Sequence, residues 1–137
     1  MSEDGAPHLS LLFTVKALVD NKNIDFLIDT GSVRSILPAS PHNNDINNNT
    51  TPIQYLQGAG GHSIPVYEKV TKTIIINYCK YTNIFYIAAV SNAISGSDFL
   101  ATHNFLAVCS DNSLIHSKDG YKIKGSSIQS NTVNNVH

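Results

Sequence analysis

The sequence predicts a small all-β, barrel-like domain with one short helix. Three observations lead to this fold class. The 137 residues leave room for one domain. The apolar residues fall into many short runs that are separated by turn-forming residues, and only Asp98–Asn104 has a helical pattern. We predict three parts: a polar N-terminal segment over residues 1–8, a folded domain over 9–123, and a polar C-terminal tail or linker over 124–137.

Each strand is predicted from its apolar run and the turn that follows it. Leu9–Val19 and Ile24–Ile28 flank the polar stretch Asp20–Asn23. They predict a hairpin, because Asn and Asp tolerate turn geometry. The stretch Pro41–Thr51 is rich in Asn and predicts a loop, because it can bury nothing. Further extended segments are expected at Ser35–Leu37, Pro52–Gln57, His62–Tyr67, Val70–Tyr78, Asn83–Val90, Phe105–Cys109 and Ser113–Ile115.

Composition argues against several classes of function. The formal net charge is -1 and charged residues are 14%, so a basic face for nucleic acid is not expected. No apolar run approaches the roughly 20 residues of a membrane helix, and the polar start does not resemble a signal peptide. Cys79 and Cys109 form no metal-binding motif, so we expect no metal or cofactor and two free thiols in a reducing, cytoplasmic setting.

One carboxylate stands in an unusual place. Asp29 directly follows the apolar run Phe26–Ile28, and Thr30 and Gly31 then lead into a tight turn. Asp is a poor strand residue, so its position at the end of a buried strand needs a reason. The segment fits two interpretations equally well: Asp29 is a turn former, or it is a catalytic group.

A second segment favours the catalytic interpretation. In Ala93–Leu100, Gly96 comes after an apolar strand and before the short helix, and the glycine-rich stretch Gly58–Gly61 lies between the two segments. In this order and spacing, the chain resembles the retropepsin-like aspartic proteases. In detail it is similar to the proteases of gypsy-type LTR retrotransposon gag-pol polyproteins. The resemblance extends from Leu9 to Ile123 and implies a closed acid-protease barrel.

The resemblance implies a catalytic site that two chains share. This chain holds one Asp-Thr-Gly loop, so a working site needs a two-fold homodimer in which each copy supplies one Asp29. Two carboxyl groups a few ångströms apart hold one proton between them. The charged one activates water and the protonated one donates to the scissile carbonyl. Thr30 is expected to hydrogen-bond across the two-fold axis, and Gly31 permits the turn and leaves room for substrate.

The resemblance also implies a substrate-binding set. A glycine-rich hairpin tip forms a flap that closes over an extended peptide. Ser32 is expected either to donate to the outer oxygen of Asp29 or to be a solvated turn hydroxyl. Leu27, Ile64 and Ile94 are expected to line substrate pockets, although Leu27 and Ile94 equally fit a core. The flap residues in this set are Gly58, Ala59, Gly60 and Gly61.

The chain departs from the family pattern at three positions. Ser95 stands where an apolar residue is usual before the second glycine. Many retroviral members pair an acid with an arginine at the positions that Val33 and Ser97 occupy here. An ion pair between Arg34 and Asp98 is one expected substitute.

The expected partners are a second copy of the chain and extended segments of its own polyprotein, in the cytoplasm and within virus-like particles. Two alternatives stay open. One is a non-catalytic module of the same fold for dimerisation or peptide binding, against which the intact Asp29-Thr30-Gly31 argues. The other is a domesticated cellular retropepsin-like protease, such as those attached to ubiquitin-pathway proteins. The gypsy-like segment Gly96–Leu100 argues against this second alternative.

Overall fold

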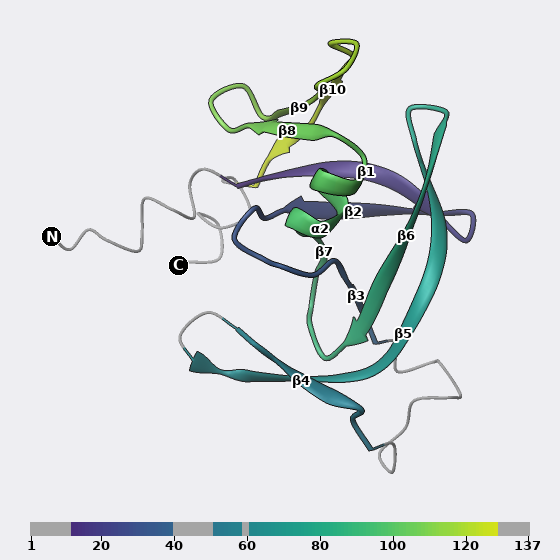
Figure 1. Cartoon of the computed structure of the whole chain (residues 1–137), viewed down its shortest axis with the longest axis vertical. Coiled ribbons are helices and arrows are strands. Elements are labelled where there is room, and N and C mark those ends of the chain that lie inside the picture. The colour runs from purple at the N-terminus through teal and green to yellow at the C-terminus, as the bar shows by residue number, and fades with distance from the viewer. Residues whose placement is uncertain (1–11, 40–50, 59–60, 129–137) are drawn as a thin grey trace, which may run out of the picture.

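The computed structural model describes residues 12–39, 51–58 and 61–128. The described chain is built of strands and one six-residue helix, α2, which confirms the all-β prediction (Figure 1). The predicted segment 1–8, most of the Asn-rich stretch, Ala59, Gly60 and residues 129–137 lie outside the described residues. The elements are β1 Phe13–Val19, β2 Lys22–Ile28, β3 Ile36–Pro38, β4 Gln54–Gln57, β5 Ser63–Ile76, β6 Cys79–Ala88, β7 Ala93–Ser95, α2 Ser97–Thr102, β8 Phe105–Val108, β9 Ser113–His116, β10 Lys122–Lys124 and β11 Ser126–Ser127.

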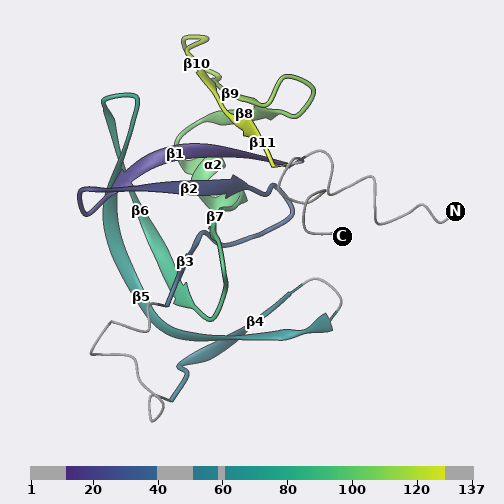
Figure 2. The same cartoon turned by 180° about the vertical axis from the view of Figure 1, so that it is seen from behind.

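Six strands close into a barrel. The large sheet has the order β11-β1-β2-β7-β3-β6-β5-β4, and an additional pairing of β1 with β5 joins the ring. That pairing places Leu18 opposite Ile75. The pairs β2–β7 and β3–β6 are parallel, whereas β1–β2 and β5–β6 are antiparallel. The closed ring is β1-β2-β7-β3-β6-β5, with β4 and β11 as additions at its margins (Figures 1 and 2).

The first hairpin forms where the sequence predicts it. Along β1 the burial alternates, so Phe13, Val15, Ala17 and Val19 all face the core. The turn to β2 uses positive φ angles of 53° and 66° at Asp20 and Asn21. These residue types adopt left-handed backbone more readily than most, and such two-residue turns match the twist of the flanking strands.

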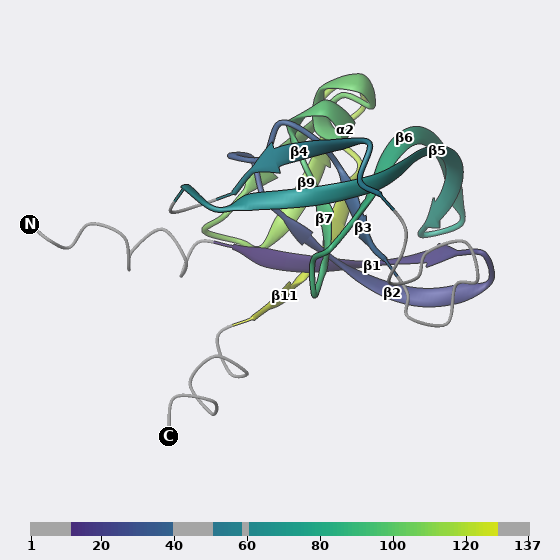
Figure 3. The same ribbon diagram turned by 90° about the horizontal axis from the view of Figure 1, so that it is seen from below.

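The segment Ser63–Ile76 is one long strand instead of the two shorter ones expected. A register shift between Val66 and Glu68 marks the point where the alternation breaks. Because a bulge absorbs one extra residue, the strand continues in the same sheet. Its second half pairs with β6, and its first half pairs with β4 to form an arm that runs across the molecule (Figures 1 and 3).

The chain after the helix forms a small second sheet in the order β10-β9-β8. The prediction of a polar tail from residue 124 is wrong at its start. Lys124 ends β10, and Ser126–Ser127 pair with Thr14 and Phe13 of β1 (Figure 2). Strand pairing uses backbone groups, so a polar segment can add to a free sheet edge without burying side chains.

The main core lies inside the barrel and extends to α2 and the small sheet. Its largest fully buried side chains are Phe13, Phe85, Phe99, Ile74 and Leu114. A smaller cluster of Ile36, Val66, Tyr86 and Ala88 sits beside it, at the base of the β4–β5 arm. In the part of the chain described, no helix has the length and hydropathy needed to cross a membrane.

Candidate active site

Sheet order forces the Asp29 loop to cross over β7. Strand β7 lies between β2 and β3, so the chain that joins β2 to β3 must pass over its end. Two backbone hydrogen bonds fix this crossing. The Asp29 N–H donates to the Ser95 carbonyl at 3.0 Å, and the Ser97 N–H donates to the Ser32 carbonyl at 2.7 Å. Asp29 is thereby held at the end of a buried strand and not at the tip of a free hairpin.

Gly96 is required by this crossing. A Cβ atom at residue 96 would lie 2.6 Å from the carbonyl oxygens of both Ser32 and Arg34. Both neighbours are backbone atoms of the crossing loop, so they cannot swing away as a side chain would. The glycine that the sequence analysis placed before the helix therefore has a steric reason that belongs to the fold.

Asp29 is half-buried, and its carboxylate is supported by its own loop. The Gly31 N–H donates to Asp29 Oδ1 at 3.0 Å, and the Ser32 N–H donates to the Asp29 carbonyl at 3.0 Å. The expected bond from the Ser32 hydroxyl to Asp29 is not formed. That hydroxyl donates to the Arg34 carbonyl at 2.8 Å, because a short-range acceptor in the same turn is better placed. Thr30 is exposed, which leaves its hydroxyl accessible to a second chain.

A serine and an aspartate tie the loop to the helix. Ser35 is fully buried; its hydroxyl donates to Asp98 Oδ1 at 2.7 Å and accepts the Gly96 N–H at 3.0 Å. The Ser35 N–H donates to Asp98 Oδ2 at 3.1 Å. The expected ion pair between Arg34 and Asp98 is therefore wrong: Ser35 occupies the carboxylate, and the guanidinium lies 5.5 Å from the centre of the Tyr86 ring.

Asp29 opens into a hollow of about 710 Å³ between its loop and the β4–β5 arm. Of the predicted site residues, Asp29, Gly31, Ser32, Gly58, Ile64 and Ile94 line this hollow. Leu27, Thr30 and Gly61 do not line it in the single chain, and Ala59 and Gly60 lie outside the described residues. Leu27 is half-buried on the face of β2 opposite Phe26 and Ile28. Asp29 is the one carboxylate among the residues that line the hollow.

The arm above the hollow is a hairpin with a tight tip. Gln57 pairs with Ser63, and the Gly58 N–H donates to the His62 carbonyl at 2.7 Å. Gly61 has a φ of 84°, a conformation that favours glycine. The flap prediction falls on this hairpin, although two of its residues, Ala59 and Gly60, lie outside the described residues.

Five residues that line the hollow are not among the predicted site residues: Val33, Arg34, Ile36, Leu56 and Gln57. Leu56 and Ile36 belong to the small apolar cluster, which continues into the wall of the hollow. The sequence of β4, QYLQ, does not alternate, so it does not show that Leu56 faces inward while Tyr55 is 60% exposed. Arg34 follows Asp29 in the same loop, but from the sequence we expected it to pair with Asp98 and not to line the hollow.

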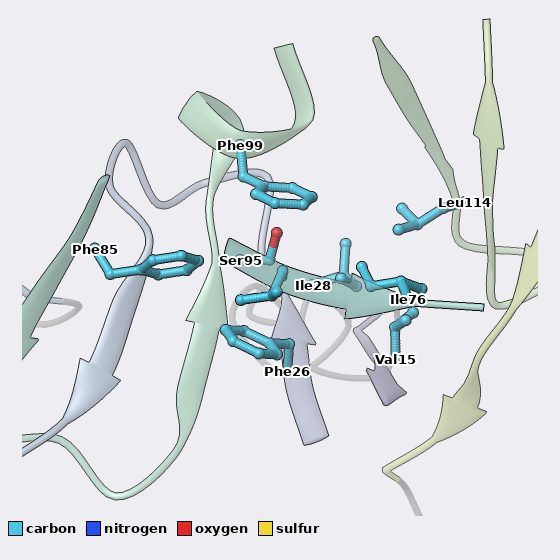
Figure 4. A pocket seen from close by; sticks show the side chains of 9 residues that line it. Val15, Phe26, Ile28, Ile76, Phe85, Ser95, Phe99 and Leu114 are labelled. Carbon is cyan, nitrogen blue, oxygen red and sulfur yellow. The ribbon is translucent and has the colours of Figure 1, made fainter. Parts of the chain in front are cut away.

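Ser95 is a polar residue that lies unpaired within the core. It is 5% exposed, and its hydroxyl has no hydrogen-bond partner. The side chain borders an enclosed cavity of about 10 Å³ whose other lining residues are all apolar. Figure 4 shows the hydroxyl among these side chains, directed toward Phe99. In the described part of the chain, no group of three His, Cys, Asp or Glu residues is arranged to hold a metal ion.

Comparison with known proteins identifies the fold. No protein-family model matches the chain, and no curated protein matches it by sequence. Among solved structures, the retroviral protease-like domain of Ddi1 from Leishmania major aligns with a TM-score of 0.61 at 14% identity, over 83% of this chain and 93% of that one. The EIAV protease in complex with the inhibitor HBY-793 aligns with a TM-score of 0.51 at 22% identity, over 65% of this chain and 85% of that one. Together with the six-stranded closed barrel and its single short helix, these likenesses show that the chain has a retropepsin-like fold.

Proposed function

We propose that the protein is an aspartic endopeptidase that works as a homodimer. The observation that carries this proposal is Asp29 itself. It is the single carboxylate lining a hollow with largely apolar walls, and its own loop holds it at the end of a buried strand. Peptide hydrolysis by this chemistry needs two such groups, and each chain contributes one to its hollow. A second copy is the simplest source of the other.

The chemistry follows from placing the two carboxyl groups together. Two like charges a few ångströms apart resist joint ionisation, so the pair keeps one proton. The ionised carboxylate takes a proton from a water molecule, and the water attacks the scissile carbonyl carbon. The protonated carboxyl group donates first to the carbonyl oxygen and afterwards a proton passes to the leaving nitrogen. The Gly31 N–H donates to Asp29 Oδ1 at 3.0 Å and so fixes the position of the carboxylate within its loop.

The hairpin tip around Gly58 and Gly61 supplies the second part of the proposal. An extended peptide in the hollow would lie between the Asp29 loop and the β4–β5 arm. Closure of the arm would exclude bulk water and pair backbone with backbone. Ile64 and Ile94 line the hollow and provide apolar contacts for substrate side chains. Leu27 and Thr30, which do not line the hollow of one chain, are proposed to act in the assembled dimer.

We propose that the substrate is the polyprotein that contains the chain, of the gag-pol type, and that cleavage takes place in the cytoplasm within assembling particles. A second candidate is a protease domain of a cellular protein. It is favoured by the alignment with the Leishmania major Ddi1 domain, which covers more of this chain than the EIAV protease alignment does. Placing the full chain between two reporter proteins separates the candidates. Self-release that Asp29→Asn abolishes supports polyprotein processing, whereas intact fusions with cleavage of added peptides support the second candidate.

The activity itself is tested with the purified full chain and a library of apolar peptides, from about pH 4 to about pH 7. We expect cleavage that a statine-type transition-state analogue inhibits and that Asp29→Asn abolishes. Because Asn has the size of Asp and the carboxylate makes only loop contacts, the variant should retain its fold by circular dichroism. Cleavage that survives Asp29→Asn would overturn the assigned chemistry. A chain that folds, dimerises and binds these peptides without cutting any of them would instead be a binding module.

A further inference from the structure

A second groove adjoins the candidate active site. It has a volume of about 460 Å³ and lies over the outer face of β5 and β6 beside α2. Arg34 lines both this groove and the Asp29 hollow, so its side chain borders the two spaces at once. The groove is lined by Arg34, Lys69, Thr71, Thr82, Asn83, Ile84, Tyr86, Asp98 and Thr102.

Two cations share one aromatic ring in this groove. The Arg34 guanidinium and the Lys69 ammonium each lie 5.5 Å from the centre of the Tyr86 ring, and Tyr86 is only 5% exposed. A buried ring that two cations contact gives both a defined position. Among the described residues, neither has a carboxylate within ion-pair distance. Other cations of the chain do have such partners: Lys16, Lys72, Lys122 and Lys124.

Asp98, the one acidic residue that lines the groove, already accepts hydrogen bonds from other parts of the chain. Asp98 Oδ1 accepts the Ser35 hydroxyl and the Phe99 N–H, both at 2.7 Å. Asp98 Oδ2 accepts the Ser35 N–H at 3.1 Å. The two Ser35 donors hold the carboxylate against the Asp29 loop. The groove is lined by two positive charges and one negative charge. The groove therefore carries a positive charge without a partner.

We propose that this groove binds an acidic side chain of the substrate peptide, several residues away from the bond that is cut. The proposal rests on the proposed peptidase function and names its substrate class. A guanidinium presents a planar set of donors that matches a carboxylate, and the Lys69 ammonium adds a second positive charge in the same groove. Because Arg34 also lines the Asp29 hollow, a peptide extended through that hollow can reach the groove with a flanking side chain.

The test uses pairs of peptides that are identical except at one position, which is Glu in one peptide and Gln in the other. One such pair is made for each position on either side of the cleaved bond. For the full-length chain at low salt, we expect a higher kcat/KM for the Glu peptide at one or more positions, by about fivefold and mainly through KM. The preference should shrink at high salt, because screening weakens an interaction at the surface. Arg34→Gln and Lys69→Gln should each reduce the ratio between the two peptides toward one, and Arg34→Glu should reverse it in favour of a Lys peptide.

Lys80→Gln is the matched control, because Lys80 is an exposed cation of β6 that lines neither the groove nor the hollow. It should leave the ratio unchanged. Equal kcat/KM for every Glu and Gln pair, or a preference that survives Arg34→Gln and Lys69→Gln, would overturn the proposal. So would an equal loss in Lys80→Gln, which would indicate a general effect of net charge.

Failure of the proposed function gives a different result, namely no cleavage of any peptide. The groove is then tested by direct binding, with fluorescence anisotropy of the same labelled peptides on the Asp29→Asn chain. Tighter binding of the Glu peptide that Arg34→Gln abolishes supports the groove without catalysis. Equal binding of the Glu and Gln peptides overturns it.

Discussion

Replacing Ser95 should stabilise the protein, which is unusual for a buried residue in the core of a domain. Three polar residues are buried in the described chain: Ser35, Ser95 and Ser113. The hydroxyls of Ser35 and Ser113 donate to Asp98 and Asp111, whereas that of Ser95 has no partner. Burial without a hydrogen bond costs a hydroxyl group about 1–3 kcal/mol. Ser35 and Ser113 are therefore controls for Ser95: all three are buried, but only Ser95 lacks a hydrogen-bond partner.

The magnitude for Ser95→Val comes from two terms. Removing the unpartnered hydroxyl contributes about 1–3 kcal/mol. Filling the neighbouring cavity of about 10 Å³ contributes only about 0.2 kcal/mol at ~24 cal/mol per Å³. The hydroxyl therefore dominates, and β-branched Val also suits a strand. We expect the free energy of unfolding to rise by at least about 1 kcal/mol and Tm by at least about 4 °C.

The assay is urea unfolding at one fixed protein concentration, because association of two chains would add to the apparent stability. Ser95→Ala removes the hydroxyl without adding bulk and should stabilise by a smaller amount. Ser113→Ala, which breaks a bond of 3.1 Å, should destabilise by about 1 kcal/mol. If Ser95→Ala lowers the free energy of unfolding as much as Ser113→Ala does, then the Ser95 hydroxyl has a partner and the reasoning is refuted.

Two further predictions concern the crossing loop and the helix. Gly96→Ala should cost about 3 kcal/mol or more in urea unfolding, because its Cβ would meet two backbone oxygens at 2.6 Å; a loss below about 1 kcal/mol would show that the loop yields easily. Burial lowers the pKa of His103 below its usual 6.5, although a hydrogen bond with the Thr82 carbonyl opposes the shift. The unfolded chain then binds protons more readily than the folded one, so stability is complete above about pH 6.5 and falls as the pH drops below it. His103→Gln should flatten this part of a stability-against-pH curve, and an unchanged slope would contradict the assignment.

Local pattern was enough to predict the early strands and the Asp29 loop. The alternation of Phe13–Val19 and the Asp20-Asn21 turn are properties of neighbouring residues, and both are confirmed. The long strand β5 was missed because the sequence pattern breaks at its bulge. The predicted start of the C-terminal tail was wrong because β11 pairs with β1 through backbone groups, and such pairing leaves no apolar pattern in the sequence.

The candidate site was predictable only in part, for a physical reason. Asp29 and Gly96 are constrained by their own loop crossing, and a glycine or an acid after an apolar strand is visible in the sequence. Leu56 joins the site because the β4–β5 arm lies over the Asp29 loop, an arrangement that a single sequence does not reveal. The ion pair expected between Arg34 and Asp98 was wrong for the same reason: the fold brings the buried Ser35 closer to the carboxylate than the exposed arginine.

The central claim is that one Asp29 is half of a catalytic pair and that an identical chain supplies the other half. Calorimetric titration of the full chain with a statine-type transition-state analogue tests it most directly, because such a ligand engages both carboxyl groups together. The account predicts one inhibitor bound for every two chains, and no binding to Asp29→Asn. One inhibitor bound for every chain, by a species that sedimentation shows to be a monomer, would contradict it.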